Sequence, residues 1–116
     1  MTLSPLILTA AGGSLGAMSR AILHRHLDTH FPWATFVVNA LGSFLLGIIM
    51  AALANRAMLE GATIAVGFCG GFTTFSTFSF STLKLFRTGH PGKAIVNIGL
   101  NLIACPVALW LGIVLG

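Results

Sequence analysis

Residues 67–79 read GFCGGFTTFSTFS, and they constrain the fold more than any other stretch of this chain. The glycines weaken a helix, since each one in a helix interior costs about 1 kcal/mol relative to alanine. Serines and threonines follow at once, although the sequence on both sides is strongly apolar. A helix broken within a membrane survives only where its freed backbone groups line a cavity or are buried in protein. Because broken membrane helices direct such groups at ions, the stretch points first to ion handling.

The composition places most of the chain in a lipid bilayer. Hydrophobic residues make up 56% of the 116 residues and charged residues only 7%, whereas a soluble domain carries about 25% charged residues. The apolar residues do not alternate with polar ones, so helices are predicted rather than strands. A helix needs about 20 residues to cross a membrane. We therefore expect an all-α membrane protein with a single domain over residues 1–116. Its four spans would lie at about 4–23, 33–55, 61–86 and 93–115, and the third would be broken.

The number and position of the charged residues exclude several classes of function. The only carboxylates, Asp28 and Glu60, lie outside the predicted spans. A proton-coupled exporter of organic cations would need a carboxylate at membrane depth. No Ser–His–Asp set and no cluster with metal-ligand spacing can be assembled, so we do not expect an enzyme. The net charge of +4 comes from residues near the span ends, which suits lipid headgroups rather than nucleic acid.

Small residues recur at a spacing of four. Gly12 and Gly16 share a face of the first span, and Ser43 and Gly47 share a face of the second. Such pairs let a neighbouring membrane helix approach closely. The cysteines, Cys69 and Cys105, are expected to act as small packing residues.

Uncharged polar residues remain inside the predicted spans. Asn39 lies among apolar residues of the second span, and Asn97 and Asn101 share one face of the fourth. Each amide could instead serve only to hydrogen-bond a neighbouring helix. Phe75 and Phe78 lie three apart on one helix face, and the edge of a phenyl ring carries partial positive charge. Amides, hydroxyls and ring edges together suit a small anion stripped of water, although ordinary packing stays an alternative for the rings.

Residues 67–79 resemble the GFxGGxTTFSTFS signature of the Fluc/CrcB family of fluoride channels. The resemblance extends to residues 13–17 with Arg20 in the first span and to residues 33–42 in the second. It implies passive, fluoride-selective export that gives fluoride resistance, from a multi-pass protein of the bacterial inner membrane. It also implies a dimer of four-helix subunits inserted antiparallel, with two fluoride pores.

The same resemblance implies roles for single residues. A structural sodium ion at the dimer centre would be held by the main-chain carbonyls of Gly70 and Thr73. The fluoride pathway would be formed by amides, hydroxyls, ring edges and one vestibule cation, namely Asn39, Asn97, Asn101, Ser76, Thr77, Phe75, Phe78 and Arg20.

The cations are placed unevenly along the predicted spans. The side that holds both termini has one side-chain cation, Arg56, and the other side has Arg20, Arg25, Lys84, Arg87 and Lys93. The positive-inside rule then predicts one preferred orientation, with both termini outside the cell. The dimer would form with a second copy or with a paralogous subunit of opposite orientation. Arg20 either snorkels to the interface or faces an aqueous vestibule that attracts anions.

Two other classes of protein stay open as alternatives. One is a small multidrug or cation transporter built as a four-helix antiparallel dimer, which substrate-driven proton uptake would reveal. The other is a structural membrane subunit without transport, in which Asn39→Leu or Phe78→Ala would change assembly alone.

Overall fold

A computed structural model describes residues 3–27, 31–54 and 59–116. All regular secondary structure in these ranges is helical, which confirms the predicted all-α class. The helices, in chain order, are α1 (Leu3–Leu27), α2 (Trp33–Ala54), α3 (Leu59–Phe72), α4 (Phe75–Arg87) and α5 (Pro91–Leu115). The end of the predicted second span, Asn55, and the loop residues 28–30 and 56–58 lie outside the described ranges.

Among the described residues, three helical segments are long and apolar enough to cross a membrane. They are Ser4–Leu27, Trp33–Leu53 and Pro91–Leu115, with mean hydropathies of 1.4, 2.2 and 2.2. Helices α3 and α4 have 14 and 13 residues, so each is shorter than the ~20 residues that one crossing needs. These two helices occupy the segment 61–86 that the sequence predicts as the third span.

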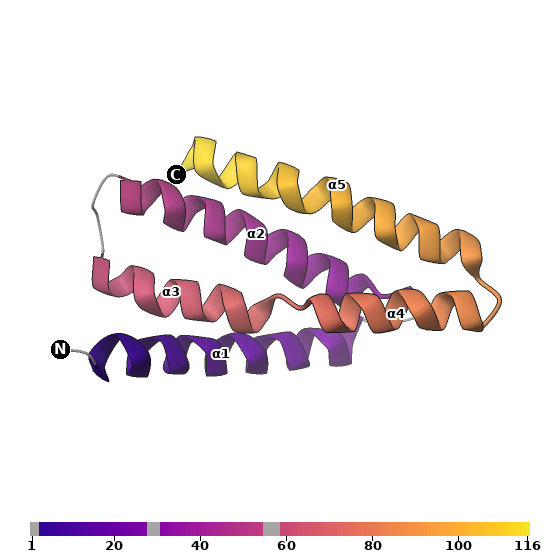
Figure 1. The fold of residues 1–116 in the computed structure, drawn as a ribbon, viewed down its shortest axis with the longest axis horizontal. Helices are drawn as coiled ribbons and strands as arrows, with labels where there is room; N and C mark the ends of the chain where they lie inside the picture. The colour runs from indigo at the N-terminus through magenta and orange to yellow at the C-terminus, as the bar shows by residue number, and fades with distance from the viewer. Residues whose placement is uncertain (1–2, 28–30, 55–58) are drawn as a thin grey trace.

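The helices form an elongated bundle of 52 × 28 × 21 Å (Figure 1). α1 packs along α3, and α2 packs along α5. α2 also contacts α3, so it connects the two pairs, while α4 continues beyond α3 and contacts α5. Both termini lie at one end of the bundle, and the turn between α4 and α5 lies at the other (Figure 1).

Glycines let α1 and α3 approach until their backbones touch. A methyl group on Gly12 would collide with the carbonyl oxygen of Ile64, and one on Gly16 would collide with the carbonyl oxygen of Phe68. The small-residue face predicted at Gly12 and Gly16 is therefore the face that meets α3. Gly47 of the second predicted pair plays the same part for α2, where it lies against the backbone of α5 around Gly112.

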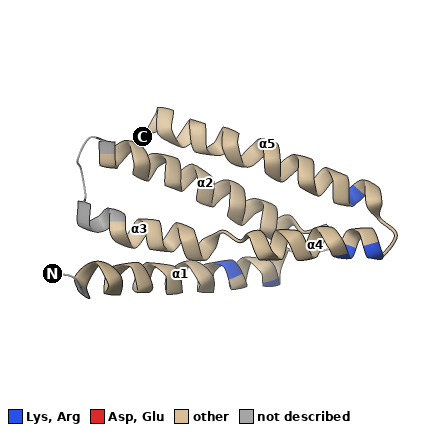
Figure 2. Ribbon diagram, in the orientation of Figure 1, with Lys and Arg blue, Asp and Glu red and all other residues tan. Residues whose placement is uncertain are grey.

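Large apolar side chains cover the outside of the bundle. Leu6, Ile103 and Leu115 are among many that are exposed, as a lipid solvent allows. The described lysines and arginines lie in the half of the molecule away from the two termini (Figure 2). This distribution matches the uneven placement that the sequence predicts, apart from Arg56, whose placement is not described.

Candidate functional site

The junction between α3 and α4 consists of Thr73 and Thr74, which are not helical. The N–H and the hydroxyl of Thr73 both donate to the carbonyl oxygen of Cys69, at 3.0 and 2.9 Å, and so close the last turn of α3. Thr74 is extended, with φ −153° and ψ 123°, and its Oγ1 accepts the N–H of Thr77 at 3.2 Å. A threonine in this position is a favoured N-cap, because its oxygen satisfies one free N–H of the first turn.

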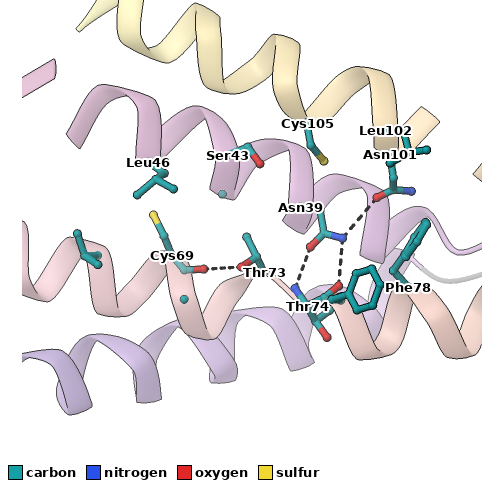
Figure 3. A pocket seen from close by; sticks show the side chains of 14 residues that line it. Asn39, Ser43, Leu46, Cys69, Thr73, Thr74, Phe78, Asn101, Leu102 and Cys105 are labelled. Carbon is teal, nitrogen blue, oxygen red and sulfur yellow. Dashed lines mark hydrogen bonds between the residues drawn. The ribbon is translucent and has the colours of Figure 1, made fainter. Parts of the chain in front are cut away.

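Asn39 of α2 hydrogen-bonds both backbone groups of one junction residue, Thr74. Its Oδ1 accepts the N–H of Thr74 at 2.8 Å, and its Nδ2 donates to the carbonyl oxygen of Thr74 at 3.1 Å (Figure 3). Thr74 is buried, with 7% of its surface exposed, so water does not readily replace these bonds. The amide of Asn39 therefore supplies the hydrogen bonds that the interrupted helix cannot supply for itself.

An open pocket with a volume of about 470 Å³ lies beside the junction (Figure 3). Its walls come from α2, α3, α4 and α5, and no lysine, arginine, aspartate or glutamate is among the lining residues that the structure describes. The lining residues are Asn39, Gly42, Ser43, Leu46, Val66, Cys69, Gly70, Thr73, Thr74, Phe75, Phe78, Asn101, Leu102 and Cys105. The pocket thus offers amides, hydroxyls and aromatic rings without a formal charge.

The two predicted phenylalanines contact one another at the start of α4. The ring centroids of Phe75 and Phe78 are 5.8 Å apart, and the ring planes are tilted by 41°. Phe78 is half-buried, whereas 79% of Phe75 is exposed. The Phe78 ring is therefore packed within the bundle, and the Phe75 ring extends away from it.

The predicted polar face of α5 is hydrogen-bonded across the bundle. Asn101 Nδ2 donates to the backbone oxygen of Asn97 at 2.9 Å and to its Oδ1 at 3.2 Å. Asn97 Nδ2 donates to the hydroxyl of Thr82 at 2.9 Å, and Asn39 Nδ2 lies 3.4 Å from Asn101 Oδ1. Sequence reasoning missed Thr82, although its spacing of four from Phe78 puts the two on one face of α4.

Four predicted pathway residues do not line this pocket in the single chain. Ser76 and Thr77 lie beside it, where each hydroxyl is 3.2 Å from the hydroxyl of Thr74. Arg20 is half-buried on α1, and its backbone oxygen bonds a ring nitrogen of His24 at 2.9 Å. The fourth, Asn97, is also absent from the lining but touches it through Asn101.

The carbonyl oxygens of Gly70 and Thr73 accept no hydrogen bond within the described ranges. The N–H of Thr74, which would bond Gly70 in a continuous helix, is taken by Asn39, and no donor within the described ranges reaches either oxygen. Gly70 is exposed, and a methyl group placed on it would meet nothing within 4 Å. Free carbonyl oxygens of this kind are suitable ligands for a hard cation.

Replacing Thr74 with alanine should weaken the junction by a moderate amount. The variant loses the oxygen that caps α4, which typically costs about 1 kcal/mol. We expect a lower stability of purified Thr74→Ala in a denaturant titration followed by circular dichroism. Thr74→Ser keeps the capping oxygen and is the matched control, so equal losses in both variants would contradict the capping role.

Fold and site define a multi-pass helical membrane protein with an uncharged polar pocket beside the α3–α4 junction. Residues 7–113 match the family model described as CrcB-like protein, Camphor Resistance (CrcB), and the chain belongs to this family. A Hydrogenovibrio crunogenus protein named fluoride-specific ion channel FluC is 44% identical over 93% of this chain and 87% of its own length. FluC proteins of Opitutus terrae and Magnetococcus marinus are 42% and 40% identical, over 95% and 92% of this chain and 90% and 93% of their own lengths.

Family membership decides two of the expectations drawn from the sequence. The relatives are ion channels by name, so the chain belongs to a channel family and not to a family of enzymes. Together with the three membrane-length helices among the described residues, this makes it a multi-pass protein of the bacterial inner membrane.

Proposed function

We propose that this chain is a subunit of a fluoride-selective ion channel that exports fluoride passively and gives fluoride resistance. The relatives named above carry that activity in their names. The observation that carries the proposal is the joint placement of Asn39, Phe75 and Phe78 around one uncharged pocket. An amide N–H and the positive edges of phenyl rings can replace the water of a small anion.

In this proposal, α3 and α4 act together as one broken membrane span. Residues 59–87 exceed the length that a crossing needs, while neither helix is long enough alone. Asn39 hydrogen-bonds the backbone groups freed at Thr74, so a break at membrane depth would leave neither group unpaired in the bilayer.

The hydroxyl and cationic groups would act before and after the ring pair. Ser76 and Thr77 surround the Thr74 hydroxyl and would offer donors to an anion that leaves the pocket. Asn97 and Asn101 would continue the polar track on α5, and Arg20 would attract anions at a vestibule. No charged residue is among the described residues that line the pocket, which would keep a dehydrated fluoride from being held too tightly to leave.

A sodium ion would be a structural ligand of the junction. The free carbonyl oxygens of Gly70 and Thr73 would bind this ion. Hard cations take about six oxygen ligands, so two oxygens from this chain would need partners from a second subunit. The ion would supply a fixed positive charge beside these oxygens.

An antiparallel dimer would place those partners. Gly70 and most of Phe75 are exposed in the single chain, and the pocket is open beside them. A second copy, or a paralogous subunit of opposite orientation, would cover this face and complete two pores.

Fluoride efflux from liposomes tests the proposal. Vesicles that contain only this protein are loaded with potassium fluoride, and a potassium carrier is added while a fluoride electrode records release. We expect rapid release from the wild type, because the orientation bias acts when the cell inserts the chain and does not prevent purified chains from pairing antiparallel. If vesicles with this chain alone retain fluoride and release it after a paralogous subunit is added, the heteromeric form is favoured. Proton-driven uptake of an organic cation without fluoride release would instead support the transporter alternative.

A fixed orientation in the membrane is a further prediction. The described cations lie in the half away from the termini (Figure 2), and a cytoplasmic excess of lysine and arginine sets topology. Reporter enzymes fused to either terminus should therefore be active only outside the cytoplasm. Substituting Lys84, Arg87 and Lys93 with glutamine is the matched control and should produce mixed orientations. Equal reporter activity on both sides for the wild type would contradict the prediction.

A further inference from the structure

A directed row of hydrogen bonds runs from the junction through α5 to α4. It starts at the N–H of Thr74 and passes through the side chains of Asn39, Asn101, Asn97 and Thr82. The hydroxyl of Thr82 in turn donates to the carbonyl oxygen of Phe78 at 2.8 Å. The row therefore begins and ends on backbone groups that flank the first turn of α4. Asn97 is 0% exposed and Asn101 only 6%, so neither amide is free to exchange its partners for water.

The orientation of every amide in the row follows from its two ends. At the far end, the carbonyl of Phe78 can only accept, so the hydrogen of Thr82 points at it and Thr82 must accept from Asn97 Nδ2. Asn97 Oδ1 then faces Asn101, which must present its Nδ2 there and its Oδ1 to Asn39.

The near end gives the same orientation independently. The N–H of Thr74 can only donate, so Asn39 turns its Oδ1 to Thr74 and its Nδ2 to Asn101 Oδ1. Because both ends agree, the side-chain oxygen of Asn101 is held against the second N–H of Asn39, a residue that lines the pocket.

This arrangement leaves Asn39 without a free donor. One hydrogen of its Nδ2 goes to the carbonyl of Thr74, and the other is directed at Asn101 Oδ1. The second bond, at 3.4 Å, is the longest in the row and exceeds the usual 2.7–3.2 Å range for N–H···O bonds. Asn39 and Asn101 both line the pocket (Figure 3). An anion that entered would have to take the hydrogen that Asn101 now holds, next to an oxygen that repels it.

We propose that Asn101 is an occupancy-determining residue whose side-chain oxygen competes with the anion for the Asn39 donor. Asn97 keeps Asn101 in that orientation, since turning the amide over would break its two bonds to Asn97. The competition makes the anion leave more easily and weakens its binding at low concentration. This role rests on the proposed fluoride conduction and adds to it a residue that limits occupancy.

Asn101→Ser distinguishes competition for the Asn39 donor from a purely structural role of the Asn101 amide. A serine at 101 can donate to the carbonyl of residue 97 as Ser14, Thr73 and Thr82 do to the residue four before them. The variant is therefore expected to fold, while its shorter side chain withdraws the competing oxygen. We expect the fluoride concentration at half-maximal flux to fall by about two- to tenfold, as the loss of one competing hydrogen bond implies.

The measurement is fluoride efflux from liposomes over a range of internal fluoride concentrations, scaled to the amount of folded protein. Asn97→Leu removes the Oδ1 acceptor of the Asn101 amide but keeps the backbone oxygen, so the amide is held less firmly and the half-maximal concentration should fall by less than in Asn101→Ser. Ser19→Ala removes a hydroxyl bond to a helix carbonyl of α1, away from the pocket, and should leave both parameters unchanged. An unchanged or higher half-maximal concentration in Asn101→Ser overturns the proposal. Absence of flux in the wild type, both alone and after a paralogous subunit is added, would instead overturn fluoride conduction itself, which keeps the two failures distinct.

Discussion

Asn39→Leu is expected to abolish fluoride flux and to destabilise the bundle. Leucine has a similar volume, but it leaves the N–H and the carbonyl of Thr74 without partners in a buried position. Each unsatisfied buried group costs about 1–3 kcal/mol, so the free energy of unfolding should fall by at least about 2 kcal/mol. The junction would then lose its fixed shape. We expect flux to fall by about a hundredfold or more, which corresponds to about 2.7 kcal/mol in barrier height.

Fluoride efflux and a denaturant titration of the same preparation measure the two effects of Asn39→Leu. Val37→Leu is a suitable control, since residue 37 is half-buried on the same helix and is not among the pocket-lining residues. The control should conduct and unfold like the wild type. Wild-type flux in Asn39→Leu would show that the amide does not hold the conducting junction.

Gly16→Ala is expected to be among the most damaging single methyl additions in the described part of the chain. The added carbon would meet the carbonyl oxygen of Phe68 and lie 2.8 Å from the backbone nitrogen of Phe72. Backbone atoms cannot rotate away as a side chain can, so α1 and α3 must separate. We expect a loss of about 3 kcal/mol, the upper part of the range for overpacking. Because Phe72 is the last residue of α3, the displacement should also disturb the junction and reduce flux.

Gly99→Ala is the matched control, because it adds the same methyl group to α5 where nothing lies within 4 Å. Alanine favours a helix over glycine by about 1 kcal/mol, so this variant should be as stable as the wild type or slightly more so. Unfolding in mixed micelles with increasing sodium dodecyl sulfate measures both variants. Equal stability of Gly16→Ala and Gly99→Ala would refute the backbone contact between α1 and α3.

Local features of the structure are those that the sequence could predict. Gly70 and Gly71, followed by Thr73 and Thr74, indicate an interruption because glycine and capping hydroxyls act on their own neighbours. α3 ends at Phe72, and α4 begins at Phe75. The face of Asn97 and Asn101 follows from helical spacing, and their contact in the structure needs no information from elsewhere in the chain.

The contacts between distant residues could not be predicted in the same way. Asn39 and Thr74 are 35 positions apart, and nothing near either residue indicates the other. The direction of the Asn101 amide depends on Thr82, a third residue on another helix. Arg20 shows the same limit, since its position near a span end does not reveal on which side of α1 it lies relative to the pocket.

The selectivity of the reconstituted protein for fluoride over chloride tests the central claim most directly. Liposomes that hold this protein are loaded with equal amounts of the two anions, and ion-specific electrodes follow both during the same efflux. An uncharged pocket that dehydrates a small anion through Asn39 and the two rings should release fluoride and retain chloride. Release of both anions together, or of neither even after a paralogous subunit is added, would contradict the claim.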